Sequence, residues 1–296
     1  MFKIALCQMP DSQKADMAEN KKETWEKASS MVREAAAVGA KIVALPEMWN
    51  CPYTGNQFRE YAEPADGESV KKMSALAKEL GIYLVGGSIS EIEPSTDKIY
   101  NTSFIFDTEG RVIGKHRKMH LFDIDVKERK NADGTIKPAI HFKESASLTP
   151  GDSDTVVDVK LETENGIEEF KLGIAICFDV RFPELFRRMT LACARLVILP
   201  ASFNLTTGPA HWDVTMRARA IDNQIYFAAC SPARNMQSKY HSYGNSCVVT
   251  PWGDFAAHAD EKEGILYADI DLSYVDVIRD ELPLLKTLKA KAEKFR

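Results

Sequence analysis

The same arrangement of residues occurs once in each half of the chain. Residues 193–204 read CARLVILPASFN and match residues 39–50, GAKIVALPEMWN, at Ala, Val, Leu, Pro and Asn. Residues 224–231, QIYFAACS, match residues 81–88, GIYLVGGS, and each of these stretches follows a segment with helical spacing of apolar residues. Short apolar strands that alternate with helices imply sheets covered by helices. We therefore expect an α/β protein built from two similar halves.

Apolar residues at helical spacing predict two helices in the first half. The first is expected from residue 20, where Asn20 caps the helix and Glu23 completes a capping box, to Gly39. The second covers residues 70–80 and ends at Gly81. Further helices are expected from residue 183, over 210–223 and within 273–295, and strands at 4–8, 41–45, 82–86, 100–106, from 112, at 172–176, 246–250 and 265–271.

The composition is that of a protein that binds small molecules. With 296 residues, of which 45% are hydrophobic and 27% charged, residues 1–296 can form a single domain with a substantial core. Basic and acidic residues are interspersed and the net charge is −5, so we expect neither a nucleic-acid surface nor a membrane surface. Uninterrupted apolar runs stay well short of the ~18 residues of a membrane helix. A cytoplasmic protein is the expectation.

The cysteines show no pattern of disulfides or metal binding. They lack C-x-x-C pairs and histidines at zinc-finger spacing, which argues against a disulfide framework, a structural metal and a redox role. We expect six thiols and neither a metal nor another cofactor. The six are Cys7, Cys51, Cys177, Cys193, Cys230 and Cys247.

Cys177 lies where a strand gives way to a turn. The apolar residues 172–176 predict a strand that ends at this cysteine, and Pro183 begins a helix. A side chain at such a corner is held rigidly and can project into a cleft, as a nucleophile must. The alternative is a buried cysteine that only fills space, which is the common role of a free cysteine.

A carboxylate and a lysine also lie directly after expected strands, as Cys177 does. Glu47 follows Leu-Pro at the end of an expected strand, and Lys118 lies just past another. Alone, such a glutamate is often a cap or an ion-pair partner, and a lysine in a basic run is usually solvated. Together with Cys177 they supply a base, a cation and a nucleophile.

In these three segments the chain resembles the nitrilase superfamily of carbon–nitrogen hydrolases, whose catalytic Glu, Lys and Cys follow in this order. The resemblance extends from residues 4–8 to residues 265–271. Residues 202–212, SFNLTTGPAHW, and 231–235, SPARN, are most similar to the ω-amidase branch. The resemblance implies a four-layer αββα sandwich, in which two sheets lie face to face with helices outside.

The resemblance also implies a mechanism. Cys177 attacks the amide carbonyl, Glu47 transfers protons, and Lys118 with the backbone N–H of Phe178 binds the oxyanion. Ammonia leaves, and water hydrolyses the resulting thioester. In the segment FKES, Glu144 matches an additional active-site glutamate of the family.

The implied substrate is a short dicarboxylic acid monoamide, such as α-ketoglutaramate or α-ketosuccinamate. Its distal carboxylate needs a cation or dense donors, and Arg181 is the candidate, unless Arg181 pairs with Glu184 instead. The candidate pocket walls are Tyr53, Phe122 and Phe203, and the candidate polar contacts are Asn204 and Thr206.

Other functions remain open at this stage. A deaminated glutathione amidase or an N-carbamoyl amidase would use the same three residues, and a non-catalytic nitrilase-like scaffold would need none of them. The turn-rich residues 127–138, which include Asn-Ala-Asp-Gly at 131–134, predict a surface loop or a lid. The family also implies a homodimer, with the apolar residues 273–296 as a candidate interface.

Overall fold

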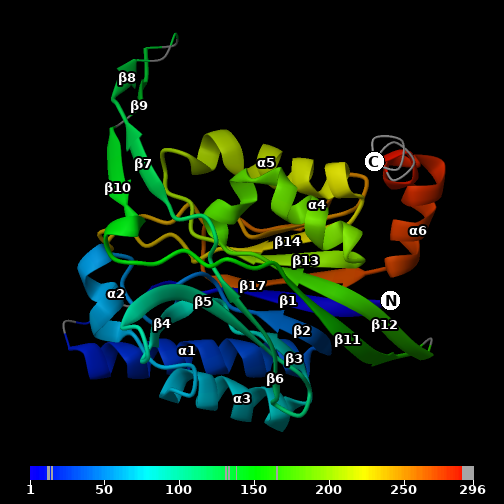
Figure 1. Ribbon diagram of the computed structural model, residues 1–296, viewed down its shortest axis with the longest axis horizontal. Coiled ribbons are helices and arrows are strands. Elements are labelled where there is room, and N and C mark those ends of the chain that lie inside the picture. The colour runs from blue at the N-terminus through cyan, green and yellow to red at the C-terminus, as the bar shows by residue number, and fades with distance from the viewer. Residues whose placement is uncertain are drawn as a thin grey trace.

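A computed structural model describes residues 1–288 of the chain, apart from residues 12, 13, 15, 131, 133, 138 and 165. Two large sheets lie face to face and helices cover their outer sides (Figure 1). The first sheet has the strand order β17-β1-β2-β3-β5-β4, with β6 paired to β5. Its strands are β1 (Phe2–Gln8), β2 (Ala40–Ala44), β3 (Tyr83–Val85), β4 (Ile89–Glu93), β5 (Lys98–Phe106), β6 (Val112–Arg117) and β17 (Gly264–Ile270).

The second sheet repeats this plan. Its order is β11-β12-β13-β14-β15-β16, and the central strands β12, β13 and β14 run parallel, as β1, β2 and β3 do in the first sheet. Its strands are β11 (Thr155–Thr163), β12 (Gly166–Ile174), β13 (Ala194–Pro200), β14 (Tyr226–Cys230), β15 (Cys247–Val249) and β16 (Phe255–His258).

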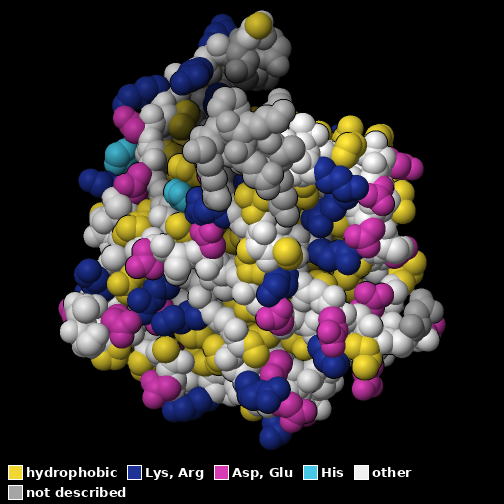
Figure 2. Space-filling view, turned by 45° about the vertical axis from the view of Figure 1, so that its right-hand side comes forward, with side chains coloured by type: hydrophobic (Ala, Val, Ile, Leu, Met, Phe, Trp, Pro, Cys, Tyr) yellow, Lys and Arg dark blue, Asp and Glu magenta, His cyan; other side chains and the backbone are white. Residues whose placement is uncertain are grey.

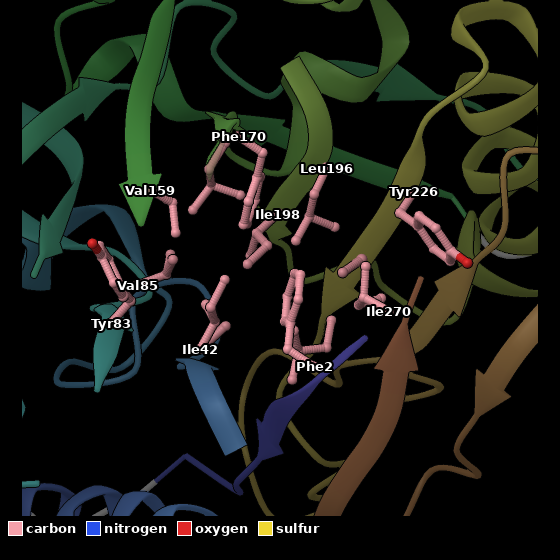
Figure 3. Packing of buried hydrophobic residues seen from close by; sticks show 14 of the residues in the cluster. Phe2, Ile42, Tyr83, Val85, Val159, Phe170, Leu196, Ile198, Tyr226 and Ile270 are labelled. Atoms are coloured by element: carbon pink, nitrogen blue, oxygen red, sulfur yellow. The ribbon is translucent and has the colours of Figure 1, made fainter. Parts of the chain in front are cut away.

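The main core lies between the two sheets. Phe2 and Ile42 of the first sheet meet Phe170 and Ile198 of the second (Figure 3), and the rings of Phe2 and Phe170 stack with centroids 5.3 Å apart. Burial of such aromatic and branched side chains contributes about 1.5–3 kcal/mol each to folding. This shared core fixes the two halves against each other.

A helical layer covers the outer face of each sheet. The helices α1 (Met17–Ala37) and α3 (Glu68–Leu80) pack on the first sheet, and α4 (Pro183–Leu191) and α5 (Gly208–Asn223) pack on the second. The four-layer αββα prediction is therefore confirmed. The prediction for residues 70–80 is also confirmed, because α3 ends at Gly81, whose φ of +62° favours glycine.

Several predicted elements need correction. The first helix begins at Met17, because Asp16 caps it by accepting a hydrogen bond from the N–H of Glu19, and Asn20 lies within the helix. The strand before Cys177 ends at Ile174, not at residue 176. Four elements were not predicted, namely β4, β11, β16 and the short helix α2 (Gly55–Tyr61).

The charged stretch from residue 127 to 138 is not a plain loop. It belongs to a narrow β-ribbon that projects from the body of the protein (Figure 1). The strands β7 (Asp123–Val126) and β10 (Ile140–Lys143) pair at its base, and β8 (Arg129–Lys130) and β9 (Ile136–Lys137) pair farther out. Asn131, Asp133 and Pro138 lie outside the described residues.

The C-terminal region is helical on both sides of Pro283, within the residues that the structure describes. The helix α6 (Leu272–Glu281) ends just before Pro283, and the residues after 288, which belong to the expected helical region, lie outside the described part of the chain. In that described part, each helix is too short or too polar to cross a bilayer. On the face shown in Figure 2, basic and acidic side chains are interspersed, as the sequence predicts.

Candidate active site

Three of the predicted catalytic side chains meet in the interior. The Lys118 Nζ lies 3.0 Å from Glu47 Oε1 and 2.9 Å from Glu144 Oε2, and none of the three side chains is exposed. Glu47 follows β2, Lys118 follows β6, and Glu144 begins a short 3-10 turn directly after β10. One lysine thus bridges two carboxylates that come from separate elements.

Cys177 faces the same cluster from the second sheet. It begins the 3-10 turn Cys177–Arg181 after β12, and its φ is +44°. A non-glycine residue in this left-handed region costs of order 1–3 kcal/mol, and such strain concentrates at functional sites. The thiol lies 3.9 Å from the carbonyl oxygen of Ser202, and the Glu47 carboxylate is near enough to act on its pKa. The site therefore joins residues of both halves.

Burial and neighbouring charges shift the pKa values of these groups. Burial raises the pKa of Glu47 above its ordinary value of 4.5, although Lys118 acts in the opposite direction. Burial would lower the pKa of Lys118, but Glu144 and Glu47 raise it well above its ordinary value. Burial and the Glu47 charge raise the pKa of the Cys177 thiol. The arrangement at rest is a protonated thiol beside a carboxylate of increased basicity and a fixed cation.

Glu47 is held by donors that the sequence analysis did not identify. Asn101 Nδ2 lies 2.9 Å from Glu47 Oε1, and the backbone N–H of Ser202 lies 2.9 Å from Oε2. Asn101 is a buried polar residue in the middle of β5. A polar side chain inside an expected strand was the signal in the sequence that could have pointed to it. The Tyr240 hydroxyl, also missed, donates to the Ser202 carbonyl at 2.6 Å.

The predicted wall residues Tyr53 and Phe122 lie at the cluster. The Tyr53 hydroxyl is 3.3 Å from Glu47 Oε1 and 3.2 Å from Glu144 Oε1, so Tyr53 is a polar neighbour as well as a wall. The backbone N–H of Phe122 donates to Glu144 Oε2 at 2.6 Å. A cavity of about 10 Å³ beside Glu47 is also lined by Tyr53 and Tyr240, and it has the size of about one water molecule.

Arg181 ends the turn that begins at Cys177. Its guanidinium lies 4.9 Å from the centre of the Phe203 ring, and no carboxylate of the described residues is within ion-pair distance, Glu184 included. Burial lowers the pKa of Arg181, but an arginine stays protonated. A half-buried cation without a counterion is suited to bind an anion.

Asn204 and Thr206 lie together in the segment before α5. The Asn204 Oδ1 accepts hydrogen bonds from the N–H groups of Thr206 and Thr207, both at 2.9 Å, and thereby shapes this segment. Its Nδ2 is buried and has no partner among the described residues. Only this amide nitrogen of Asn204 is therefore free to contact a ligand.

Comparisons with known proteins agree with this geometry. Residues 3–280 match the family model described as carbon-nitrogen hydrolase. The mouse protein named omega-amidase NIT2 is 44% identical over 98% of this chain and 95% of its own. The crystal structure of Saccharomyces cerevisiae Nit3, described as a member of branch 10 of the nitrilase superfamily, has a TM-score of 0.80 and 40% identity, and the match covers 96% of this chain and 94% of that chain.

The chain belongs to the carbon–nitrogen hydrolase family, as its sequence predicts. A further relative, the Saccharomyces cerevisiae protein named omega-amidase NIT3, is 42% identical over 96% of this chain and 92% of its own. The predicted resemblance to the nitrilase superfamily and its ω-amidase branch is thus confirmed.

Proposed function

We propose that this protein is an ω-amidase that hydrolyses the terminal amide of short dicarboxylic acid monoamides. The observation that carries the proposal is the position of Arg181 on the same short turn as Cys177, where it has no carboxylate partner among the described residues. A substrate with an amide at one end and a carboxylate at the other matches these two groups. The names of the mouse and yeast relatives support the same substrate class.

The proposed reaction uses the side chains of the cluster together with the backbone N–H of Phe178, which follows Cys177 on the same turn. The Cys177 sulfur attacks the amide carbon while Glu47 accepts the thiol proton. Lys118 and the backbone N–H of Phe178 bind the negative oxygen that develops on the carbonyl. The C–N bond then breaks, Glu47 returns its proton to the leaving nitrogen, and ammonia and a thioester result.

Water completes the cycle. Glu47 takes a proton from a water molecule, whose oxygen attacks the thioester carbon. The C–S bond breaks, the free acid forms, and the thiolate recovers its proton from Glu47. Glu144 fixes the Lys118 ammonium through its carboxylate. This scheme needs no metal or cofactor.

In this proposal Arg181 binds the distal carboxylate, and the rings of Phe122 and Phe203 form apolar walls. A guanidinium can hold a carboxylate with two parallel hydrogen bonds, which fixes the orientation of the substrate as well as its affinity. The unpartnered Nδ2 of Asn204 is a further donor, and Thr206 belongs to the same segment.

The test is ammonia release from a panel of amides with Cys177→Ala as the blank. The panel contains α-ketoglutaramate, α-ketosuccinamate, succinamate, glutamine, deaminated glutathione and N-carbamoyl-β-alanine. Release confined to the keto-acid and succinyl amides is the expected result. Release only from deaminated glutathione or the carbamoyl compound would agree with the Glu47–Lys118–Cys177 chemistry and contradict the proposed substrate class. Release from none, with an unreactive Cys177, would favour a scaffold.

We also propose a cytoplasmic homodimer. All six cysteines are free thiols, which is typical of a reducing compartment. Apolar side chains are exposed on neighbouring helical segments, and this pattern is common at subunit interfaces. They include Val214, Ile221, Val277, Leu282, Leu284 and Leu288. Sedimentation equilibrium of the purified protein tests the dimer, and a monomer at micromolar concentration would contradict it.

A further inference from the structure

A buried carboxylate that the proposed reaction does not use lies two residues after the nucleophile. Asp179 is completely buried and accepts five hydrogen bonds. Its Oδ2 accepts from Ile176 N and His116 Nε2, both at 3.0 Å. Its Oδ1 accepts from Met119 N at 3.2 Å, His120 N at 2.9 Å and His120 Nδ1 at 2.8 Å. A carboxylate has about four lone-pair sites, so both oxygens of Asp179 are fully engaged.

These donors come from two segments that are far apart in the sequence. Ile176 belongs to the start of the Cys177 turn, whereas His116, Met119 and His120 flank Lys118 on both sides. Within the described residues, the hydrogen bonds between these two segments all end on Asp179. This one carboxylate therefore ties the nucleophile turn to the lysine segment.

The backbone of Lys118 itself is held by hydrogen bonds to residues outside these two segments. Lys118 N donates to the carbonyl of Asn101 at 2.8 Å, and Gly151 N donates to the carbonyl of Lys118 at 2.8 Å. The second ring nitrogen of His116 lies 3.1 Å from Thr155 Oγ1. The lysine segment is thus a rigid frame, and Asp179 attaches the nucleophile turn to it.

Asp179 is ionised in the folded protein. Burial alone would raise the pKa of its carboxyl group, but hydrogen bonds from His116 and His120 hold it far below its ordinary value of 3.8. Hydrogen bonds to an ionised acceptor are about twice as strong as neutral ones. The attachment can therefore hold Cys177 in its strained conformation at φ +44°.

We propose that Asp179 is a positioning residue, which holds the Cys177 thiol and the Lys118 ammonium at the mutual distance that thiolate formation and oxyanion binding need. The inference rests on the proposed catalytic roles of Cys177 and Lys118. Asp179 itself does not touch the substrate and transfers no proton. The charged or titratable groups that act on Cys177 directly are Glu47, Lys118, Arg181, Tyr53 and Tyr240.

The test compares Asp179→Asn with a matched control, Glu91→Gln. Asparagine keeps the size of the side chain, but its NH₂ group replaces one carboxylate oxygen. This group faces N–H donors and cannot accept their hydrogen bonds. Glu91 is also buried, and it accepts hydrogen bonds from Thr102, Lys115 and Arg117. Two of these partners lie on β6 beside His116, yet none lies on the nucleophile turn. The control therefore loses a comparable buried network without loosening Cys177.

Two readouts are measured on folded protein. For Asp179→Asn, kcat is expected to fall by about 10²-fold, the effect of a displacement of about 1 Å, while KM changes less than about threefold. The second readout is the pH dependence of Cys177 alkylation by iodoacetamide, followed by peptide mass because Cys193 is exposed. Its midpoint is expected to move upward by about one unit or more, because Lys118 no longer stabilises the thiolate fully.

The outcomes separate this inference from the proposed function. If Asp179→Asn and Glu91→Gln have the same kcat and the same alkylation midpoint, Asp179 has no positioning role. The alkylation readout needs no substrate, so it decides the question even if the amide panel gives no ammonia. If Asp179→Asn does not fold, His120→Phe replaces it, because it removes the Nδ1 hydrogen bond to the same carboxylate and keeps an aromatic ring against Phe182. A lower kcat with a raised midpoint supports the role, and wild-type values of both overturn it.

Discussion

The Lys118 Nζ lies 3.0 Å from Glu47 Oε1, and neither side chain reaches solvent. Glu144 is 2.9 Å from the same nitrogen, so two carboxylates share one cation. The second carboxylate raises the pKa of Glu47, as burial does, while Lys118 opposes both effects. The cluster thereby combines a base whose strength follows mainly from burial with a positive charge that the two carboxylates maintain against burial.

The first prediction concerns the pH dependence of turnover. Glu47 can accept the thiol proton only when ionised, and its pKa is raised above 4.5. Activity should therefore fall as pH decreases through the raised value, so the acid limb of kcat/KM has its midpoint above 4.5. A pH–rate profile with a substrate of constant charge measures this midpoint. A limb at or below 4.5 would mean that another group controls the acid side.

The second prediction concerns stability. Lys118→Met removes the cation and leaves Glu47 and Glu144 buried beside each other, which should lower the free energy of unfolding by about 3–5 kcal/mol at neutral pH. Adding Glu47→Gln should restore part of this loss, because one buried charge is then removed. Urea denaturation of the two variants and the wild type measures both effects. Equal stability of Lys118→Met and wild type would show that the carboxylates are not both ionised.

The segments that carry Glu47, Lys118 and Cys177 are predictable from the sequence, because each follows a short apolar strand with a clear pattern. Local patterns in the sequence do not encode every feature of the site. The φ of +44° at Cys177 could not be predicted, since this conformation depends on contacts with distant segments. The Asn101–Glu47 hydrogen bond joins residues 54 positions apart, and no local pattern encodes such a contact. The same holds for Asp179 and the histidines beside Lys118.

The strand β11, which was not predicted, has a clear pattern in the sequence. In β11, the residues Val-Asp-Val-Lys-Leu-Glu alternate strictly between buried and exposed, as a half-buried strand should. At the base of the ribbon, Asp-Ile-Asp-Val in β7 and Ile-His-Phe-Lys in β10 also alternate between exposed polar and half-buried apolar residues, a signal that was available as well. The outer strands β8 and β9 are different, because each has only two residues and shows no period. Backbone pairing alone defines these strands, and the side chains therefore predicted only a loop.

The third prediction is that Cys177→Ala abolishes turnover without loss of the fold. Its kcat should fall by more than about 10³-fold, because the variant lacks the nucleophile that forms the thioester. The thiol makes only a weak contact with the Ser202 carbonyl at 3.9 Å, so the melting temperature should change little. Circular dichroism and ammonia release measure the two effects. Cys193→Ala is the control for an exposed cysteine and should keep full activity.

The last prediction concerns the carboxylate of the substrate. Arg181→Ala should raise KM for α-ketoglutaramate and leave kcat less affected, because it removes a contact that forms in the bound state as well as in the transition state. A charge-assisted bond of about 1.5–3 kcal/mol corresponds to about a 10- to 100-fold change. The matched substrate is a simple amide of equal length without the carboxylate, whose kcat/KM should be nearly unchanged. Arg188→Ala is the matched variant, since Arg188 lies on α4 and pairs with Asp154. If both substrates lose activity equally in Arg181→Ala, the arginine supports the nucleophile turn, and the carboxylate binds elsewhere.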